Sequence, residues 1–233
     1  MRLPKPNKII AEKYVTGLSK FRNKAAKVKL SANESALGPS PKAIKEYLRL
    51  SKNFKRYPDS EGISLRKTIA KKFKLDLNRI ILGSGSDQIL ELICKAFLRK
   101  GDEVIVPKYS FLIYRLYSQM SGAKVLYSKE KNFTISVNDI LSKVTRKTKV
   151  VFLANPNNPT GTYISKKELT RLRNKVKNLL KQPIILQRSL DWYNVRNVAL
   201  SASEIAAFLT FTPVFKIPLS IPGDNAIICF AFL

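Results

Sequence analysis

The stretch that decides the fold is Val150–Ala154 (VVFLA), which is followed at once by Asn155–Gly161 (NPNNPTG). A short, continuous apolar run is typical of a strand buried in a parallel sheet, and ligands of open α/β sheets bind beyond the carboxyl ends of such strands. The two prolines fix φ within the loop and restrict the residues before them, so the loop should present Asn157 and Asn158 rigidly. The alternative is that Asn, Pro and Gly simply form a good turn here.

Strand and helix patterns alternate on both sides of this loop. After it, Ser165 is the expected N-cap of a helix, with Glu168 as its capping-box partner. The predicted strands are 79–82, 103–106, 124–127, 149–154 and 183–186, and the predicted helices are 42–50, 63–73, 88–98, 111–120, 137–143 and 165–180. This alternation predicts an α/β fold, a mostly parallel sheet with helices on both faces.

Composition excludes several classes of protein. The chain of 233 residues is long enough for one good core, and its 45% hydrophobic content is ordinary for a globular protein. No apolar run is long enough for a membrane span, and the N-terminus lacks the apolar region of a secretory signal, so we expect a cytoplasmic protein without membrane contact. The chain contains no histidine, which excludes Ser-His-Asp and Cys-His mechanisms and histidine-ligated metals. Cys94 and Cys229 have no other ligand types at metal spacing, so no metal site is predicted.

A net charge of +27 raises the question of a nucleic-acid partner. The lysines recur along predicted helical faces, where solvated positions are expected anyway, and no recognised binding module accompanies them. A general lysine bias would give the same composition, so nucleic acid is not the favoured partner. The basic and acidic residues of 187–233 balance, so the whole excess lies in residues 1–186. That abrupt shift indicates a domain boundary or a change in what the sequence encodes.

The segment Gly83-Ser84-Gly85-Ser86-Asp87 lies between a predicted strand and a predicted helix. Small residues allow the backbone to approach an anion, and the free N–H groups at a helix start favour negative charge. This pattern suits a phosphate group, although a plain strand–helix turn would look the same. It is neither the G-x-G-x-x-G pattern of dinucleotide-binding proteins nor a Walker motif.

Several short motifs occur in a distinctive order: Ser31–Glu34, Arg56–Pro58, Gly85–Asp87, Pro107–Ser110 and Asn155–Gly161. In this order they resemble the class I/II aminotransferases that use pyridoxal phosphate, most closely the histidinol-phosphate aminotransferases. The resemblance covers residues 25–186. It implies a homodimeric enzyme of histidine biosynthesis that moves an amino group between histidinol phosphate, or an amino acid, and the 2-oxo acid 2-oxoglutarate.

The resemblance also implies roles for single residues. Gly85, Ser86 and Asp87 would bind the cofactor phosphate at a helix N-terminus, and Tyr109 would stack on the pyridine ring. The further implied contacts are Asn158 with the phenolic oxygen of the cofactor, Tyr57 with the cofactor phosphate of the partner subunit, and Asn33 with the substrate. A core tyrosine at a strand end is the alternative for Tyr109.

The resemblance further implies the domain organisation. Residues 1–50 would be an N-terminal arm and part of the small domain, and 51–186 part of the cofactor-binding large domain of fold type I. Residues 187–233 would be an atypical tail, truncated or read in another frame, with the small domain largely missing.

The chain departs from the family pattern after Leu186. The family next places an aspartate opposite the pyridinium nitrogen, then a Ser/Thr-x-Ser-Lys segment whose lysine forms the Schiff base. This chain continues with Gln187-Arg188-Ser189 instead, and the catalytic residue is therefore unknown. Lys216 is the sole lysine of the tail and the one Schiff-base candidate, but it lacks the preceding hydroxyl residues. We expect the chain as written to bind pyridoxal phosphate weakly and not to transaminate. The alternatives are a catalytically dead fragment, a basic α/β module that binds RNA or another polyanion, and a related fold-type-I decarboxylase.

Overall fold

The computed structural model describes residues 37–73 and 75–179, together with the backbone of the short strands at 20–21, 24–25, 184–189, 214–216 and 227–231. Its centre is a six-stranded sheet with the strand order β4-β3-β7-β8-β10-β9. The strands are β4 (Lys124–Ser128), β3 (Glu103–Pro107), β7 (Thr148–Asn155), β8 (Ile184–Ser189), β10 (Ile227–Ala231) and β9 (Val214–Lys216). All neighbouring pairs are parallel except β9 with β10, which confirms the mostly parallel sheet.

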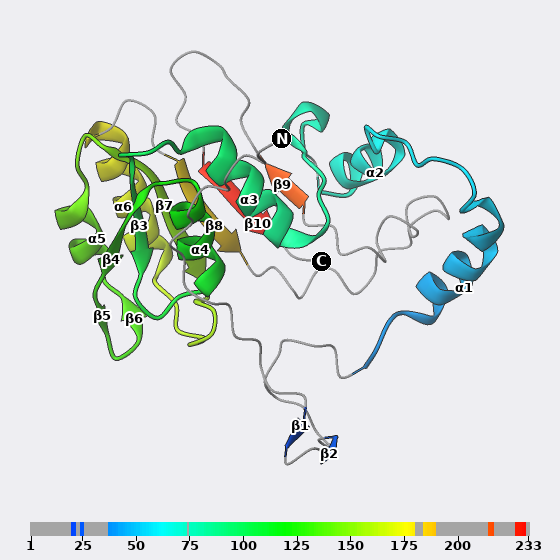
Figure 1. Cartoon of the computed structure of the whole chain (residues 1–233), viewed down its shortest axis with the longest axis horizontal. Helices are drawn as coiled ribbons and strands as arrows, with labels where there is room; N and C mark the ends of the chain where they lie inside the picture. Colours follow the sequence, from blue (N-terminus) through cyan, green and yellow to red (C-terminus); the bar gives the residue numbers. More distant parts are fainter. Residues whose placement is uncertain are drawn as a thin grey trace, which may run out of the picture.

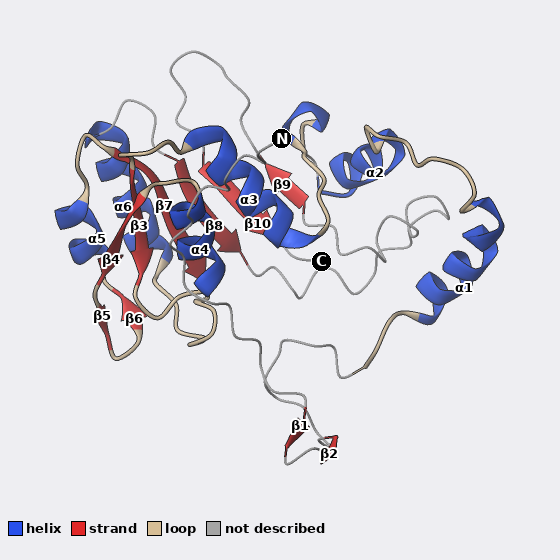
Figure 2. Cartoon of the chain, viewed as in Figure 1, coloured by secondary structure: helices blue, strands red, loops and turns tan. Residues whose placement is uncertain are grey.

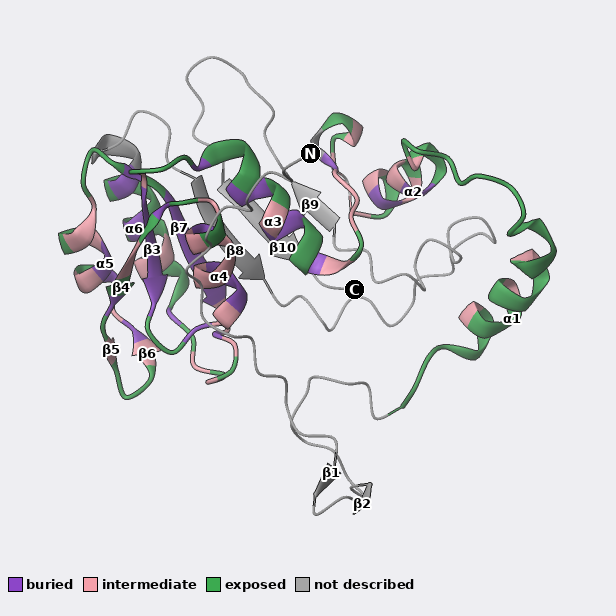
Figure 3. Cartoon of the chain, viewed as in Figure 1, coloured by how far each residue is buried: buried purple, intermediate pink, exposed green. Residues whose placement is uncertain are grey.

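Helices cover both faces of the sheet (Figures 1 and 2). On β7, the side chains of Val150 and Phe152 pack with α3 (Gly85–Phe97) and α4 (Leu112–Met120). The alternate residues Val151 and Leu153 pack with α5 (Val137–Lys143) and α6 (Lys166–Leu179) on the other face. Successive side chains of a strand point to opposite faces, so a continuous apolar run is what a strand covered on both sides requires. Figure 3 shows this buried centre.

The N-terminal part of the described chain lies away from the sheet (Figure 1). It contains α1 (Pro41–Leu50), the 3₁₀-helix η1 (Ser51–Asn53), α2 (Ile63–Phe73) and the 3₁₀-helix η2 (Leu77–Arg79). Helix α1 has no buried residue. Helix α2 buries Leu65 and Ile69 against Ile80 in a small separate cluster.

Two short antiparallel pairs complete the described structure: β1 (Lys20–Phe21) with β2 (Lys24–Ala25), and β5 (Glu130–Lys131) with β6 (Thr134–Ile135). Asn132 and Phe133 form the turn of the β5–β6 hairpin, both with positive φ. Ile135 packs into the core on the α5–α6 face, which fixes the hairpin at that side of the sheet.

One predicted strand is wrong. Residues 79–82 form the end of η2 and an unpaired extended segment rather than a strand. Ile80 does bury its side chain, but against α2 and not within the sheet. The apolar pattern therefore correctly indicated that Ile80 is buried. A strand also requires a neighbouring strand to hydrogen-bond with, and that partner is absent here in the described part of the chain.

The tail after Leu186 contributes backbone pairing to the sheet. Strand β8 continues to Ser189, and β10 runs parallel beside it. The remaining tail positions lie outside the described residues, so the predicted domain limits at 50 and 186 stay predictions. Among the helices that the structure describes, none combines the length and apolarity needed to cross a membrane.

Candidate functional site

Loops from neighbouring strands meet at the carboxyl edge of the sheet. Strands β3 and β7 are adjacent and parallel, with Ile105 opposite Val151, so the loops that follow them leave the sheet on the same side. Tyr109 and Ser110 lie in the first loop, and Asn157 and Asn158 in the second. Both loops therefore lie at the carboxyl edge of the sheet.

Asn157 ties the two loops together. Its side chain is only 3% exposed, and its Oδ1 accepts a hydrogen bond of 2.8 Å from Ser110 Oγ. Its Nδ2 donates to Thr160 Oγ1 at 3.0 Å and to the Tyr109 carbonyl at 3.4 Å. A buried amide is costly unless its donors and acceptor are satisfied, and these bonds satisfy them. Asn157 is therefore fully used in holding the edge together.

Glu130, on β5, brings the hairpin into the same network. Its carboxylate accepts from the backbone N–H of Tyr109 at 3.0 Å and from Asn157 Nδ2 at 3.4 Å. Burial raises the pKa of this carboxyl, and the hydrogen bond from the Tyr109 backbone opposes that shift. The carboxylate therefore joins three segments that are distant in the sequence.

The two ends of the Asn-Pro loop are joined by Asn155, which hydrogen-bonds to Ile164. Its side chain accepts from the Ile164 backbone N–H at 2.9 Å and donates to the Ile164 carbonyl at 3.1 Å. The predicted N-cap follows, with Ser165 Oγ accepting from the Glu168 backbone N–H at 3.3 Å. Hydrogen bonds therefore tie the loop at both ends, although Asn157, which was predicted to be presented, is buried.

Asn158 differs from its neighbour. It is half-buried, and its side-chain amide has no hydrogen-bond partner within the described part of the chain. A rigid loop therefore presents a free amide at the carboxyl edge. That arrangement suits a ligand oxygen or nitrogen.

The N-terminus of α3 opens at the same edge, because α3 runs back toward the start of β3. Gly85 has φ of +74°, a conformation that favours glycine and that allows the sharp entry into the helix. The Ser84 hydroxyl does not cap the helix, and the Ser84 backbone N–H instead donates to Gln88 Oε1 at 2.5 Å. The first-turn amides are thus not capped by the N-cap side chain, which is the arrangement that binds anions.

Ser86 and Asp87, also predicted to hold a phosphate, sit in this first turn. Ser86 is buried, whereas Asp87 lies on the outer side, where its charge acts on Tyr117 of α4. Partial burial raises the pKa of the Asp87 carboxyl. A carboxylate repels a phosphate, so the backbone N–H of Asp87 is the better contact for an anion at this position.

Two aromatic residues flank the edge, and they lie on different faces. The Tyr109 ring is 45% exposed and packs edge-on against Phe133 of the hairpin, with ring centroids 5.3 Å apart. Phe111 packs against the core cluster beneath α3 and α4 and makes an edge contact with Tyr114 at 5.7 Å. Phe111 is therefore packed against the core on the α3–α4 side, whereas the Tyr109 ring stays partly open to solvent. Nothing in the sequence pattern singled out Phe111.

The remaining predicted residues are not brought to this edge in the described structure. Tyr57 lies between α1 and α2 and is fully exposed. Lys216 lies on β9, for which the structure describes the backbone only, at the border of the sheet. Asn33 lies outside the described residues. Within the described residues, no cluster of acidic or cysteine side chains is arranged to hold a metal ion.

Comparison with known proteins identifies the family that the chain resembles. The family model for aminotransferase class I and II matches residues 25–181. A histidinol-phosphate aminotransferase of Pelagibacter ubique is 54% identical over 181 residues, which cover 77% of this chain and 50% of that protein. Another, from Paramagnetospirillum magneticum, is 42% identical over 73% of this chain and 47% of its own. The chain thus spans about half the length of the curated relatives that it matches.

Solved structures agree on the fold. The histidinol-phosphate aminotransferase of Sinorhizobium meliloti, in complex with pyridoxal-5'-phosphate, superposes with a TM-score of 0.68 at 18% identity, over 86% of this chain and 50% of that one. The corresponding enzyme of Clostridium acetobutylicum gives 0.60 at 27% identity, over 68% and 46%.

Proposed function

The chain belongs to the class I and II aminotransferase family, and we propose that it carries the cofactor-binding part of a pyridoxal-phosphate-dependent aminotransferase of the histidinol-phosphate type. The observation that carries the proposal is the difference between two adjacent asparagines. The side chain of Asn157 makes the hydrogen bonds that join the loops, and the side chain of Asn158 is free beside an open helix N-terminus. Such an edge is built to hold a polar ring that bears a phosphate.

The residues present fit this cofactor. The amides of Gly85, Ser86 and Asp87 would hold the phosphate at the N-terminus of α3, where the helix dipole favours negative charge. The Asn158 amide would donate to the phenolic oxygen of the ring. We assign the stacking contact to Tyr109, whose ring is 45% exposed and whose carbonyl accepts from Asn157 at this edge, whereas Phe111 is packed against Tyr114 and the core.

When bound, pyridoxal phosphate supplies an electron sink for the pair left when an amino acid loses its α-proton. The chain's own contribution is to bind and orient. The α3 amides would hold the phosphate, Asn158 would donate to the phenolic oxygen, and Tyr109 would cover one face of the ring and exclude water. Glu130 and Asn157 keep these loops at their fixed separation.

The substrates and assembly follow from the same assignment. The amino donor would be histidinol phosphate or an amino acid, the acceptor 2-oxoglutarate, and the location the cytoplasm. The full exposure of Tyr57 supports a homodimer in which this residue reaches the cofactor phosphate of the partner subunit. Asn33 would contact the substrate.

The proposal is tested by cofactor titration of the purified chain, followed by absorbance and by quenching of Trp192 fluorescence. Pyridoxal phosphate should bind at least about tenfold more tightly than pyridoxal, which has the ring but no phosphate, because the helix N-terminus contributes only to the former. Equal affinities for pyridoxal phosphate and pyridoxal would contradict a phosphate site at the N-terminus of α3.

Two pairs of variants locate the ring. Asn158→Ala should weaken pyridoxal phosphate binding by about tenfold, because it removes one hydrogen bond to an ionised oxygen. Tyr109→Leu should weaken it by several-fold, whereas Phe111→Leu, the matched change at the residue packed into the core, should leave it unchanged. The reverse order for the two aromatic positions would move the stacking role to Phe111.

A further inference from the structure

The amino edge of the sheet, opposite the carboxyl edge that carries the proposed cofactor site, gathers positive charge. Along the sequence the positive charge is dispersed, but a parallel sheet brings the starts of its strands together on one side. The segments before β3, β4 and β7 meet there. Their exposed cations, which we call the basic edge, are Arg99, Lys100, Lys124, Arg146, Lys147 and Lys149.

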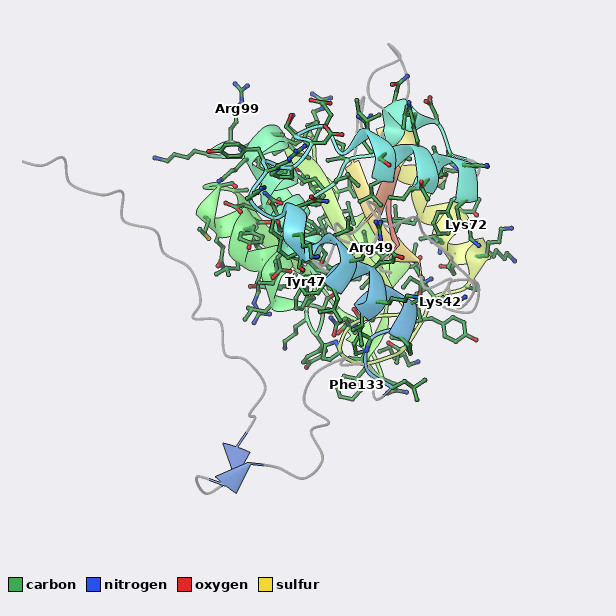
Figure 4. The ribbon with its side chains drawn as sticks, turned by 90° about the vertical axis from the view of Figure 1, so that its right-hand side faces the viewer. Lys42, Tyr47, Arg49, Lys72, Arg99 and Phe133 are labelled. Atoms are coloured by element: carbon green, nitrogen blue, oxygen red, sulfur yellow. The ribbon has the colours of Figure 1, made fainter. Side chains whose placement is uncertain are left out.

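Backbone contacts fix the basic edge as one surface. The Lys124 backbone N–H donates to the Asp102 carbonyl at 2.8 Å, and the Glu103 backbone N–H donates to the Lys147 carbonyl at 2.9 Å. A Cβ placed on Gly122 would lie only 3.4 Å from Lys100, so these two turns are in direct contact. Since adjacent strands are about 4.8 Å apart, the cations occupy a strip roughly 10 Å wide. Figure 4 shows Arg99 pointing away from the body of the protein.

The charge of the basic edge is not neutralised within the described structure. Elsewhere, cations on helices pair with carboxylates three or four residues away, as Lys95 does with Glu91 and Arg171 with Glu168. No cation of the basic edge has an ion pair to a described residue. The acidic residues nearby are engaged otherwise: Asp102 accepts from the Arg99 backbone N–H, and the buried Glu103 accepts from the Thr145 hydroxyl.

A hollow of about 400 Å³ opens beside the basic edge, between α3 and α4. Its wall includes Leu98 and Ser121, which directly precede Arg99 and Gly122, together with Tyr117 and Met120. Glu91 and Lys95 also line it, and their ion pair of 2.6 Å leaves this part of the wall without net charge. The phenol ring supplies a flat surface of the kind on which nucleobases stack. A concave hollow next to unpaired cations suits a ligand with alternating phosphates and planar rings.

We propose that the basic edge binds single-stranded nucleic acid, with the backbone phosphates on its lysines and arginines and a base in the hollow against Tyr117. Arginine forms bidentate bonds to phosphate, and lysine binds it as a point charge. No amide or carboxylate is arranged to read base edges within the described strip, so binding is independent of sequence and strongly dependent on salt. This surface lies across the sheet from the cofactor edge and does not depend on the proposed aminotransferase function.

The test is fluorescence anisotropy of the 233-residue chain with a fluorescein-labelled 20-nucleotide oligouridine over a salt series. The logarithm of the binding constant should fall with the logarithm of salt at about 0.7 per phosphate contact. The triple variant Lys100→Glu, Lys124→Glu, Lys147→Glu should lower affinity at least about tenfold at low salt and reduce the slope by about 2.

The matched control is Lys166→Glu, Lys167→Glu, Lys175→Glu on α6, which makes the same change in net charge at exposed positions on the other face. It should keep affinity within about threefold and keep the slope, since long-range charge effects are largely screened. Equal losses in both triple variants would show only a response to net charge and would overturn the proposal. Circular dichroism tests whether each variant folds. If a triple variant does not fold, single Lys→Gln variants at the same positions are measured instead.

Two further binding measurements distinguish nucleic acid from other anionic ligands. An abasic oligomer of the same length should bind several-fold more weakly with an unchanged salt slope, because it lacks the base for the hollow. Equal binding of the two oligomers would overturn the stacking part. Vesicles containing phosphatidylserine test for an anionic lipid surface. Binding to vesicles without binding to the oligomer would overturn nucleic acid as the ligand.

Discussion

Asn157 and Asn158 are adjacent and chemically identical, yet their surroundings differ completely. The partners of Asn157, among them Ser110 and Glu130, lie 47 and 27 residues away in the sequence. The loop pattern alone therefore does not separate the structural asparagine from the free one, and only the family resemblance singled out Asn158. The loop motif predicted that both amides would be presented, and the tertiary fold buries Asn157.

This contrast predicts different effects on stability. Asn157→Ala should lower the free energy of unfolding by about 2–4 kcal/mol, because it leaves the buried Ser110 hydroxyl and neighbouring groups without partners. Asn158→Ala should change it by less than about 1 kcal/mol, since no described hydrogen bond is lost. Urea unfolding of both variants measures the difference, and equal destabilisation would contradict the division of roles.

Cys94 illustrates how burial controls reactivity. Its side chain is 1% exposed, and burial raises the pKa of the thiol to about 12. The thiolate is the reactive form, so at pH 8 iodoacetamide should leave the Cys94 peptide unmodified in the native chain and modify it in urea. Because the folded state holds this proton more tightly than the unfolded state, stability should fall as pH rises from about 9 toward 12. Rapid modification of native Cys94, followed by mass spectrometry of peptides, would contradict this burial.

At the scale of elements, the sequence predicted what depends on local pattern. The helices at 63–73 and 137–143 have the predicted bounds, because their apolar spacing and caps are local signals. The β5–β6 hairpin could not be predicted, since each strand has two residues and its turn places Asn132 and Phe133 at positive φ without a glycine. The strand predicted at 79–82 failed because pairing is decided by distant residues.

Helix α1 is expected to be the least protected of the long described helices. It has ten residues, begins at Pro41 and buries no side chain, whereas α3 buries Ile89, Ile93 and others against the sheet. Isolated helices of this length are marginal in water, so its stability must come from tertiary contacts. Native-state hydrogen exchange should show fast exchange for 44–50 and slow exchange for 89–97. Slow exchange in α1 would show that another surface, such as a second copy of the chain, covers it.

At the scale of the whole molecule, one sheet separates two kinds of surface. The carboxyl edge presents the open N-terminus of α3 and Asn158, and turns at the amino edge present unpaired cations. This separation follows from the parallel pairing of β4, β3, β7, β8 and β10, whose starts lie at one edge and whose ends lie at the other. Dispersed charge in the sequence becomes a continuous basic strip only through that topology.

The last prediction concerns catalysis by the 233-residue chain. Strand β8, the neighbour of β7, reads Ile-Ile-Leu-Gln-Arg-Ser and places Ser189 opposite Asn155, so none of its own residues is a carboxylate. Without a carboxylate beside the ring nitrogen, the ring is a poor electron sink. Lys216 lies on β9, which β8 and β10 separate from β7 by roughly 14 Å at about 4.8 Å per strand.

We therefore expect no covalent attachment of the cofactor and no transamination. Borohydride treatment of the chain with pyridoxal phosphate should leave no cofactor on any lysine of the carboxyl edge by mass spectrometry, and histidinol phosphate with 2-oxoglutarate should yield no glutamate. The matched variant is Lys216→Ala, which should bind the cofactor as the unchanged chain does. Borohydride-stable cofactor on Lys216, lost in that variant, would instead make Lys216 the residue that holds the cofactor, because only a lysine aimed at the aldehyde carbon forms that bond.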